Sequence, residues 1–210
     1  MFDLLYALVH RALVRGVAAY RALTAVIAEV VAALPTPEEA AAVPASTGDW
    51  VPPLSGVQWT LIDCNNPALA MAQRRLPGCL PRRADLGEEL PLPSGSQDLI
   101  LCVHSLHALP DPPQQLRRFA DRLAPGGHLV LVTFDGPETF RAFRARMRRQ
   151  GTASFGMSVW KWLDVRITGT ASYLPDAELC AVLTGCGLQA AAPPRSVFEG
   201  TSTLRVLQRS

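Results

Sequence analysis

The chain has 210 residues, of which 49% are hydrophobic and 18% are charged, and its formal net charge at pH 7 is +2. This length suits one domain with a large apolar core, and the composition excludes a disordered chain. The net charge is too small to indicate a nucleic-acid partner, although five arginines cluster within one helical pattern. These arginines are Arg141, Arg144, Arg146, Arg148 and Arg149.

Five cysteines are scattered along the chain, and no two of them form a CxxC pair. Their odd number and wide spacing argue against a disulfide framework and a structural zinc site, and they favour a reducing compartment. Charged residues interrupt the apolar N-terminal stretch, so it predicts neither a secretory signal nor a membrane span. We therefore expect a cytoplasmic protein without a metal site.

The chain opens with helical patterns and continues with alternating strand and helix patterns. Residues 2–34 carry apolar side chains at three- and four-residue spacing, which predicts one or two amphipathic helices that end before Pro35. Residues 44–56, which contain Pro52 and Pro53, predict a loop. Alternation after residue 57 predicts a parallel sheet. The expected strands are Val57–Ile62, Leu80–Ala84, Asp98–Val103 and His128–Phe134, and the expected helices are Pro67–Leu76, Pro112–Leu123, Glu138–Arg149 and Asp176–Thr184.

The end of the chain predicts a β-hairpin. Two strand patterns, Leu188–Phe198 and Thr201–Leu207, flank a turn at Glu199 and Gly200. Such a hairpin brings an antiparallel strand to the end of an otherwise parallel sheet.

Four motifs follow one another in a fixed order between Val57 and Phe134. They are Thr60-Leu61-Ile62-Asp63 followed by Asn66-Pro67, then Arg83-Ala84-Asp85-Leu86, then Leu106-His107-Ala108-Leu109-Pro110-Asp111, and finally Leu123-Ala124-Pro125-Gly126-Gly127. In this order and spacing they resemble the class I S-adenosylmethionine-dependent methyltransferases, particularly the bacterial small-molecule and quinone-type branch. The resemblance implies a Rossmann-like, doubly wound α/β sheet of seven strands that is mostly parallel with an antiparallel C-terminal hairpin strand.

The resemblance assigns cofactor-binding roles to residues after the second and third strands. Asp63 stands where the family's acidic residue binds both ribose hydroxyls, and Cys64 follows it. A carboxylate can accept two charge-assisted bonds, each worth about 1.5–3 kcal/mol. Asp85 takes the position that bonds the adenine amino group, and the Leu86 amide takes the position that bonds an adenine ring nitrogen.

The turn after the first strand departs from the family pattern. The usual spacing places it at residues 42–48, where Ala42 replaces the acid that would hold the ammonium group of the cofactor. Pro44 and Ser46 replace the first two glycines, and Gly48 alone is in register, so Ser46 and Gly48 are the remaining cofactor-binding candidates. A side chain at Ser46 costs about 1–2 kcal/mol if the turn demands a positive φ. The short connection to the second strand also leaves little room for a helix.

Two histidines are the catalytic candidates. Methyl transfer needs the protein mainly to position an acceptor and to remove its proton. His104 lies just past the fourth strand, at the sheet edge where ligands bind, and His107 is the second candidate. Either residue could instead be structural, and we assign no role to His10 or His128.

The expected acceptor is an apolar or aromatic small molecule. The segment Ser154–Leu163 contains Phe155, Met157, Trp160 and Trp162 and lies where the family often places its acceptor lid. Bulky aromatic and thioether groups suit such a ligand, although they could equally pack against the N-terminal helices.

We interpret residues 1–37 as a helical lid or interface segment, consistent with a homodimer, and residues 38–210 as the methyltransferase-like domain. The expected activity is methyl transfer from S-adenosylmethionine. A scaffold that binds, cyclises or isomerises a small molecule, or that serves a partner protein, stays open. A nicotinamide-dependent reductase would need a glycine-rich turn after the first strand, which is absent from this sequence.

Overall fold

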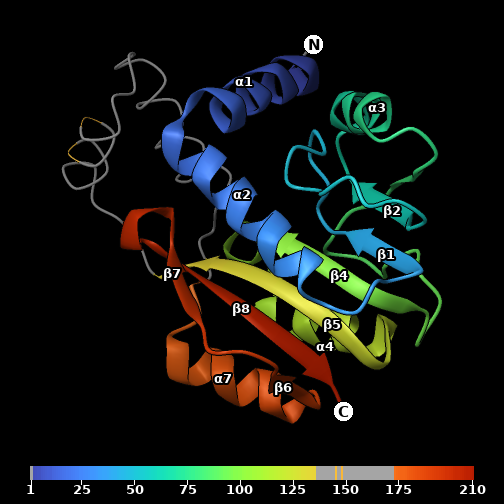
Figure 1. The fold of residues 1–210 in the computed structure, drawn as a ribbon, viewed down its shortest axis with the longest axis vertical. Helices are drawn as coiled ribbons and strands as arrows, with labels where there is room; N and C mark the ends of the chain where they lie inside the picture. The colour runs from blue at the N-terminus through green and yellow to red at the C-terminus, as the bar shows by residue number, and fades with distance from the viewer. Residues whose placement is uncertain (1, 136–144, 146–147, 149–172) are drawn as a thin grey trace.

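The computed structural model describes residues 2–135, 145, 148 and 173–210 (Figure 1). They form one twisted sheet with helices packed on both faces. One face carries α1 (Phe2–Gly16), α2 (Ala18–Ala32) and α3 (Asn66–Arg75), and the other carries α4 (Pro112–Arg122) and α7 (Asp176–Gly185). The described helices therefore confirm the predicted α/β class.

The strand order is β3-β2-β1-β4-β5-β8-β6, and β7 pairs with β8. Strands β1 to β5 are parallel to one another, whereas β8 runs antiparallel to β5. This arrangement confirms the predicted mostly parallel sheet with an antiparallel C-terminal strand. The strands are β1 (Glu39–Ala42), β2 (Gln58–Asp63), β3 (Leu80–Arg83), β4 (Gln97–Val103), β5 (Leu123–Phe134), β6 (Leu188–Ala190), β7 (Arg195–Val197) and β8 (Ser202–Arg209).

The described sheet has eight strands where the sequence predicts seven. The predicted strand Leu188–Phe198 is divided into β6 and β7, which pair with opposite ends of β8. Pro193 and Pro194 lie between them, and proline has no N–H to donate to a strand ladder. The predicted segment Ser154–Leu163 lies outside the described residues, as does nearly all of the predicted helix Glu138–Arg149.

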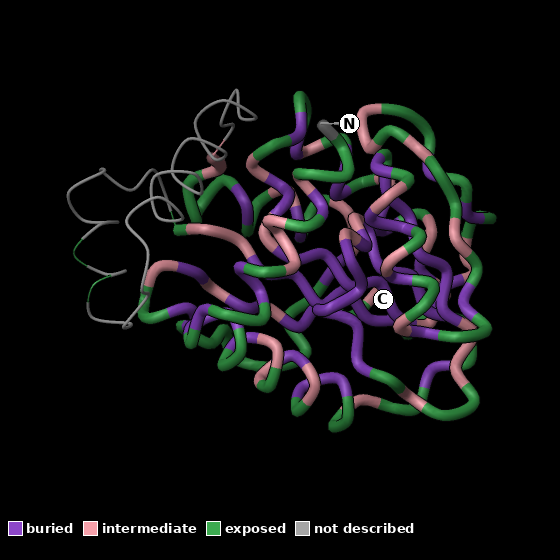
Figure 2. Tube along the Cα trace, turned by 90° about the horizontal axis from the view of Figure 1, so that it is seen from above, coloured by how far each residue is buried: buried purple, intermediate pink, exposed green. Residues whose placement is uncertain are grey.

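Successive residues of the central strands point into two separate apolar clusters. In β4, Leu99 and Leu101 pack with the side chains of α1 and α2, whereas Ile100 and Cys102 pack with those of α4 and α7. This alternation explains the continuous apolar run, because both faces of the strand are covered. Figure 2 shows the buried part of the chain concentrated in the middle of the molecule.

The connection between β1 and β2 contains turns and no helix, as its prolines predict. The N-terminal helices cover the sheet face above it. Leu23 and Ile27 of α2 are almost fully buried in the same apolar cluster as Trp50 from the connection and Leu61 from β2. Helix α2 thus completes the apolar core above the connection between β1 and β2.

Among the described residues, no helix combines the length and the apolar character that crossing a membrane requires.

The Pro-Gly-Gly segment lies in a bulge of β5. Gln97 pairs with Leu123 and Leu99 pairs with His128, so the four intervening residues of β5 loop out of register. A Cβ atom on Gly127 would lie 2.7 Å from the carbonyl oxygen of Gln97. Only glycine fits there, because the obstructing atom belongs to the backbone.

We therefore expect Gly127→Ala to lower the free energy of unfolding by about 1–3 kcal/mol, the usual cost of overpacking. Gly185→Ala is the matched control, because a Cβ at this helical residue meets no atom within 4 Å. Urea denaturation of both variants measures the difference. Equal stability of the two variants would contradict the close approach at Gly127.

Candidate active site

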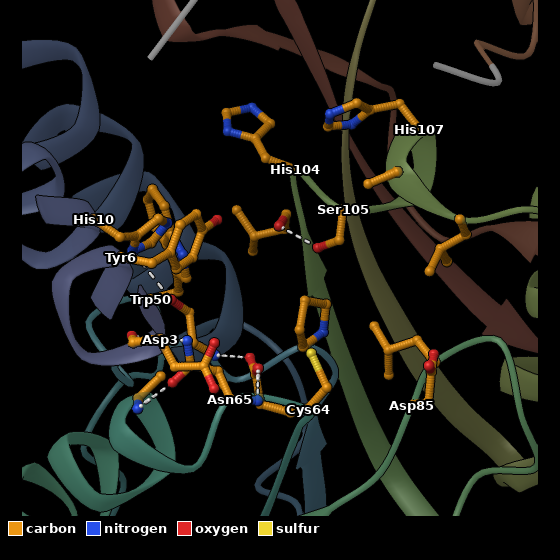
Figure 3. A pocket seen from close by; sticks show the side chains of 18 of the residues that line it. Asp3, Tyr6, His10, Trp50, Cys64, Asn65, Asp85, His104, Ser105 and His107 are labelled. Atoms are coloured by element: carbon orange, nitrogen blue, oxygen red, sulfur yellow. Dashed lines mark hydrogen bonds between the residues drawn. The ribbon is translucent and has the colours of Figure 1, made fainter. Parts of the chain in front are cut away.

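A cavity of about 410 Å³ opens at the carboxyl ends of β1, β2 and β4, beneath α1 (Figure 3). The carboxyl edge of a parallel sheet is where ligands bind in this type of fold. The structure brings seven of the eight predicted site residues to the cavity wall. These are Ser46, Asp63, Cys64, Asp85, Leu86, His104 and His107.

Asp63 ends β2 and joins three parts of the site. Its side chain is buried, its Oδ2 accepts the N–H of Ser46 at 2.8 Å, and its Oδ1 accepts the N–H of Asn65 at 2.9 Å. Asn65 in turn caps α3, because its Oδ1 accepts the N–H of Ala68. A carboxylate has about four lone-pair sites, so these two N–H groups do not saturate it.

The environment of Asp63 changes its acidity in two opposing ways. Burial raises the pKa of the carboxyl group, because burial disfavours the charged form. The N–H bonds from Asn65 and Ser46 lower the pKa, and the net direction is upward.

Ser46 lies in the turn after β1 with φ +48, in the left-handed region that favours glycine. The turn therefore does require a positive φ at Ser46, where a side chain costs energy. The hydroxyl of Ser46 faces the cavity and forms a hydrogen bond with Nδ1 of His10 at 3.0 Å.

Gly48 does not line the cavity. Its φ is +73, and a Cβ at this position would lie 3.0 Å from the Cβ of Ala72 in α3. The glycine therefore allows the turn to pack closely against α3, which is a scaffold function.

Asp85, Leu86 and Cys64 line another part of the cavity, and Asp85 lies across it from α1 (Figure 3). Oδ1 of Asp85 accepts the N–H of Gly87 at 2.8 Å, which fixes the orientation of the carboxylate. Burial raises the pKa of the Cys64 thiol, and the charges of Asp63, Asp85 and Asp3 raise it further. The thiol is therefore held in its neutral form in a region of negative potential.

His104 follows β4 with φ +50 and lies in an aromatic cluster. Its ring stacks on Phe134 with the centroids 4.0 Å apart, and Trp50 and Phe198 contact it edge to face. Nε2 of His104 forms a 2.9 Å hydrogen bond with Oγ of Ser202, which is fully buried in β8. The ring is thus held in one orientation at the cavity wall.

His107 lies in the short 3₁₀ helix η1 (Leu106–Ala108), also at the cavity wall. Its ring stacks on Tyr173 with the centroids 5.6 Å apart and contacts Phe134 edge to face. Both candidate histidines therefore share Phe134 as a neighbour.

The sequence indicated that residues 1–37 form a lid or an interface, but it did not identify the residues of α1 that line the cavity. Asp3, Tyr6 and His10 all line the cavity, although no role was assigned to His10. Their spacing of three and four residues places them on one face of the helix, and this spacing was the available signal. The pattern alone does not reveal which part of the molecule that face contacts. His128 lies in β5 and does not line the cavity.

The described wall of the cavity fits most of S-adenosylmethionine. Its volume lies within the usual range for small-molecule sites, and its charged side chains are the carboxylates of Asp3, Asp63 and Asp85 without a lysine or arginine. Such a wall suits a sulfonium cation and a nucleoside with hydroxyl groups. The turn after β1 fits less well, because Ala42 has no charge and Ser46 carries a side chain.

Comparisons with known proteins agree with this geometry. A family model described as a methyltransferase domain matches residues 43–131. A search of the curated proteins finds no match. A methyltransferase of Thermotoga maritima, described as S-adenosylmethionine-dependent and as a possible histamine N-methyltransferase, is 16% identical with a TM-score of 0.66, and the match covers 100% of this chain and 98% of that one.

Two further solved structures have the same fold. One is from the complex between the Haloferax volcanii Trm112 methyltransferase activator and a methyltransferase, with 15% identity, a TM-score of 0.69 and coverage of 98% of this chain and 96% of that one. The other is the CurJ carbon methyltransferase, with 19% identity, a TM-score of 0.65 and coverage of 91% of this chain and 55% of that one. This chain therefore spans about half the length of the CurJ structure.

The chain thus has the fold of the class I S-adenosylmethionine-dependent methyltransferases, and residues 43–131 match the family model of a methyltransferase domain. These findings support S-adenosylmethionine as the cofactor and methyl transfer as the activity.

The raised pKa of Asp63 makes a prediction about stability. Above pH 3.8, the ordinary value for this carboxyl group, the native state binds more protons at Asp63 than the unfolded chain does. The contribution of Asp63 to stability is therefore largest below pH 3.8 and falls as the pH rises through the native pKa.

Urea denaturation of the unsubstituted protein and of Asp63→Asn across this pH range measures the effect. The unsubstituted protein should lose stability relative to the variant as the pH rises from about 3.8. Asp98→Asn provides the baseline, because Oδ2 of Asp98 also accepts two backbone N–H groups but lies outside the cavity. A relative gain with rising pH would mean that the N–H bonds outweigh burial.

Proposed function

We propose that this chain transfers a methyl group from S-adenosylmethionine to an apolar or aromatic small molecule, as enzymes of the bacterial small-molecule and quinone-type branch do. The observation that carries the proposal is the carboxylate of Asp63, which lies at the tip of β2 in the wall of the cavity. His104, at the end of β4, lines the same cavity, so a cofactor group and a proton acceptor share one space.

In this proposal the nucleoside end of the cofactor lies along the ends of β2 and β3. Asp63 accepts the ribose hydroxyls with the lone pairs that Ser46 and Asn65 leave available. Asp85 accepts the adenine amino group, and the Leu86 amide donates to a ring nitrogen. Gly48 acts indirectly, by packing the turn against α3.

S-adenosylmethionine, when bound, supplies a methyl group that the positively charged sulfur already activates. The protein therefore has to orient the acceptor, keep water out and take up a proton. The carboxylates of Asp3, Asp63 and Asp85 give the cavity a negative potential, which favours a cationic ligand.

His104 is the proposed base. Ser202 and Phe134 fix its ring, so an acceptor in the cavity would meet an imidazole whose position is set before binding. His107 is the second candidate, because it lines the cavity beside the same aromatic ring.

The aromatic wall supports an apolar or planar acceptor. Tyr6, Tyr20 and Trp50 line the cavity together with His104. Flat rings offer large contact areas to a planar ligand without requiring it to carry charge.

We also propose that residues 1–37 act as a lid over the cavity and not as a dimer interface. Asp3, Tyr6 and His10 of α1 contribute directly to its wall, so the cavity is incomplete without this helix.

The alternative function is a scaffold that binds or isomerises a small molecule without methyl transfer. The observation in its favour is the turn after β1, where Ala42 and Ser46 replace an acid and a glycine.

Titration calorimetry with S-adenosylmethionine and S-adenosylhomocysteine separates the two functions. We expect both ligands to bind at one site, and we expect Asp63→Ala to weaken binding at least about tenfold, because it removes charge-assisted bonds to the ribose. Absence of heat from both ligands at millimolar concentration would favour the scaffold.

Asp98→Ala is the matched control for this titration. Like Asp63, Asp98 accepts two backbone N–H groups, from Glu38 and Glu39, but it does not line the cavity. Loss of the Asp98 carboxylate should lower stability without changing the affinity for either ligand. Weaker binding in both variants would show that the effect of Asp63→Ala arises from the fold.

His104→Asn tests the proposed base. Asparagine tolerates the left-handed backbone that His104 adopts, so the variant removes the imidazole with little strain. We expect kcat to fall by about 10²–10⁴, the usual contribution of a general base, while the affinity for S-adenosylhomocysteine changes less than about twofold. Release of S-adenosylhomocysteine with a panel of phenols and hydroxyquinones measures the rate. An unchanged rate would transfer the role to His107.

A further inference from the structure

Helix α1 presents two faces of different character. Asp3, Tyr6 and His10 line the cavity, whereas Leu4 and Leu8 are about half exposed on the helix. Figure 3 shows His10, Tyr6 and Asp3 together on the wall that α1 forms. The polar face of this helix is therefore part of the binding site.

Three polar contacts along α1 fix its position against the sheet. The side-chain amide of Asn65 donates to the carbonyl oxygen of Asp3 at 3.1 Å, near the start of the helix. Nδ1 of His10 and Oγ of Ser46 are 3.0 Å apart, and Nε of Arg15 donates to the buried carboxylate of Asp49 at 2.8 Å. The last two contacts join α1 to the turn after β1.

The turn after β1 lacks the acidic side chain that would bind the ammonium group at the amino-acid end of the cofactor. Strand β1 ends at Ala42, whose side chain is a buried methyl group. Ser46, in the same turn, has a left-handed backbone, lines the cavity and carries a hydroxyl group. The side chain that meets this hydroxyl comes from α1 and not from the turn itself.

The ring of His10 is held by its neighbours. Tyr6 stacks on it with the centroids 6.1 Å apart, and Trp50 lies edge-on at 6.3 Å. Both rings also line the cavity. The imidazole is therefore oriented at the turn before any ligand binds.

We infer that His10, together with Ser46, binds the amino-acid end of the cofactor and replaces the acidic residue that is missing at Ala42. This inference rests on the proposed function. An imidazole and a hydroxyl group can each donate and accept a hydrogen bond, so the pair can bind an ammonium or a carboxylate group. The N-terminal helix thereby supplies a contact that the turn after β1 has lost.

Two ligands that differ at the amino-acid end of the cofactor provide the test. S-adenosylhomocysteine carries the amino-acid group, whereas 5′-methylthioadenosine keeps the nucleoside and the thioether but lacks that group. Titration calorimetry on the full chain should show that His10→Ala weakens S-adenosylhomocysteine binding by about tenfold to a hundredfold, the effect of losing a bond to a charged group. The affinity for 5′-methylthioadenosine should change less than about twofold.

Two further variants keep the test independent of folding. Ser46→Ala removes the hydroxyl group without changing the backbone demand at this position, and it should show the same selective loss. Leu8→Ala lies on the same helix but outside the cavity wall, and it should change neither affinity.

The outcomes separate a failure of this inference from a failure of the proposed function. An equal loss for both ligands in His10→Ala, or no loss for either, overturns the inference while leaving the proposed cofactor in place. Binding of neither ligand by the unsubstituted protein overturns the proposed function, and the inference falls with it.

Discussion

The site depends on one buried carboxylate that holds two backbone N–H groups. Asp63 connects the tip of β2 to the turn at Ser46 and to Asn65, which caps α3. If the carboxylate were lost, both N–H groups would lose their partner at a buried position, which typically costs about 1–3 kcal/mol each. The same residue thus fixes the shape of the cavity and presents its remaining lone pairs to it. The position of Asp63 at the tip of β2 therefore explains both why its carboxylate is buried and why it can bind a ligand.

The N-terminal helices compensate for what the connection between β1 and β2 has lost. That connection has no helix to cover the sheet, and Leu23 and Ile27 of α2 fill the apolar space above it. Arg15 of α1 pairs with the buried carboxylate of Asp49, which also accepts a bond from Thr47. A buried charge requires such partners to persist. The altered turn is therefore stable because helices α1 and α2, which precede it in the chain, pack against it.

The sequence predicted the elements well where apolar periodicity is strong, as in β2, β4, α3 and α4. It failed to indicate β1 directly, because the run from Glu39 to Ala42 has no β-branched or aromatic residue. The motifs also placed Asp63, Asp85 and His107 at the cavity wall. The contact between His10 and Ser46 could not be predicted, because helical periodicity identifies a polar face but not the surface that this face meets. Similarly, nothing in the local sequence of Ser202 indicates that it bonds to His104, which is 98 residues away in the chain.

The orientation of His104 links the proposed chemistry to the antiparallel end of the sheet. Phe134 of β5 and Ser202 of β8 are direct partners across the strand pair, and His104 stacks on the first and bonds to the second. A shift of β8 by one residue would turn Ser202 to the opposite face of the sheet, because side chains alternate along a strand. The antiparallel strand therefore does more than close the sheet, since its register sets the position of the imidazole. A parallel strand at the same edge would have a different pattern of partners, and this histidine would lose one of the two contacts that fix its ring.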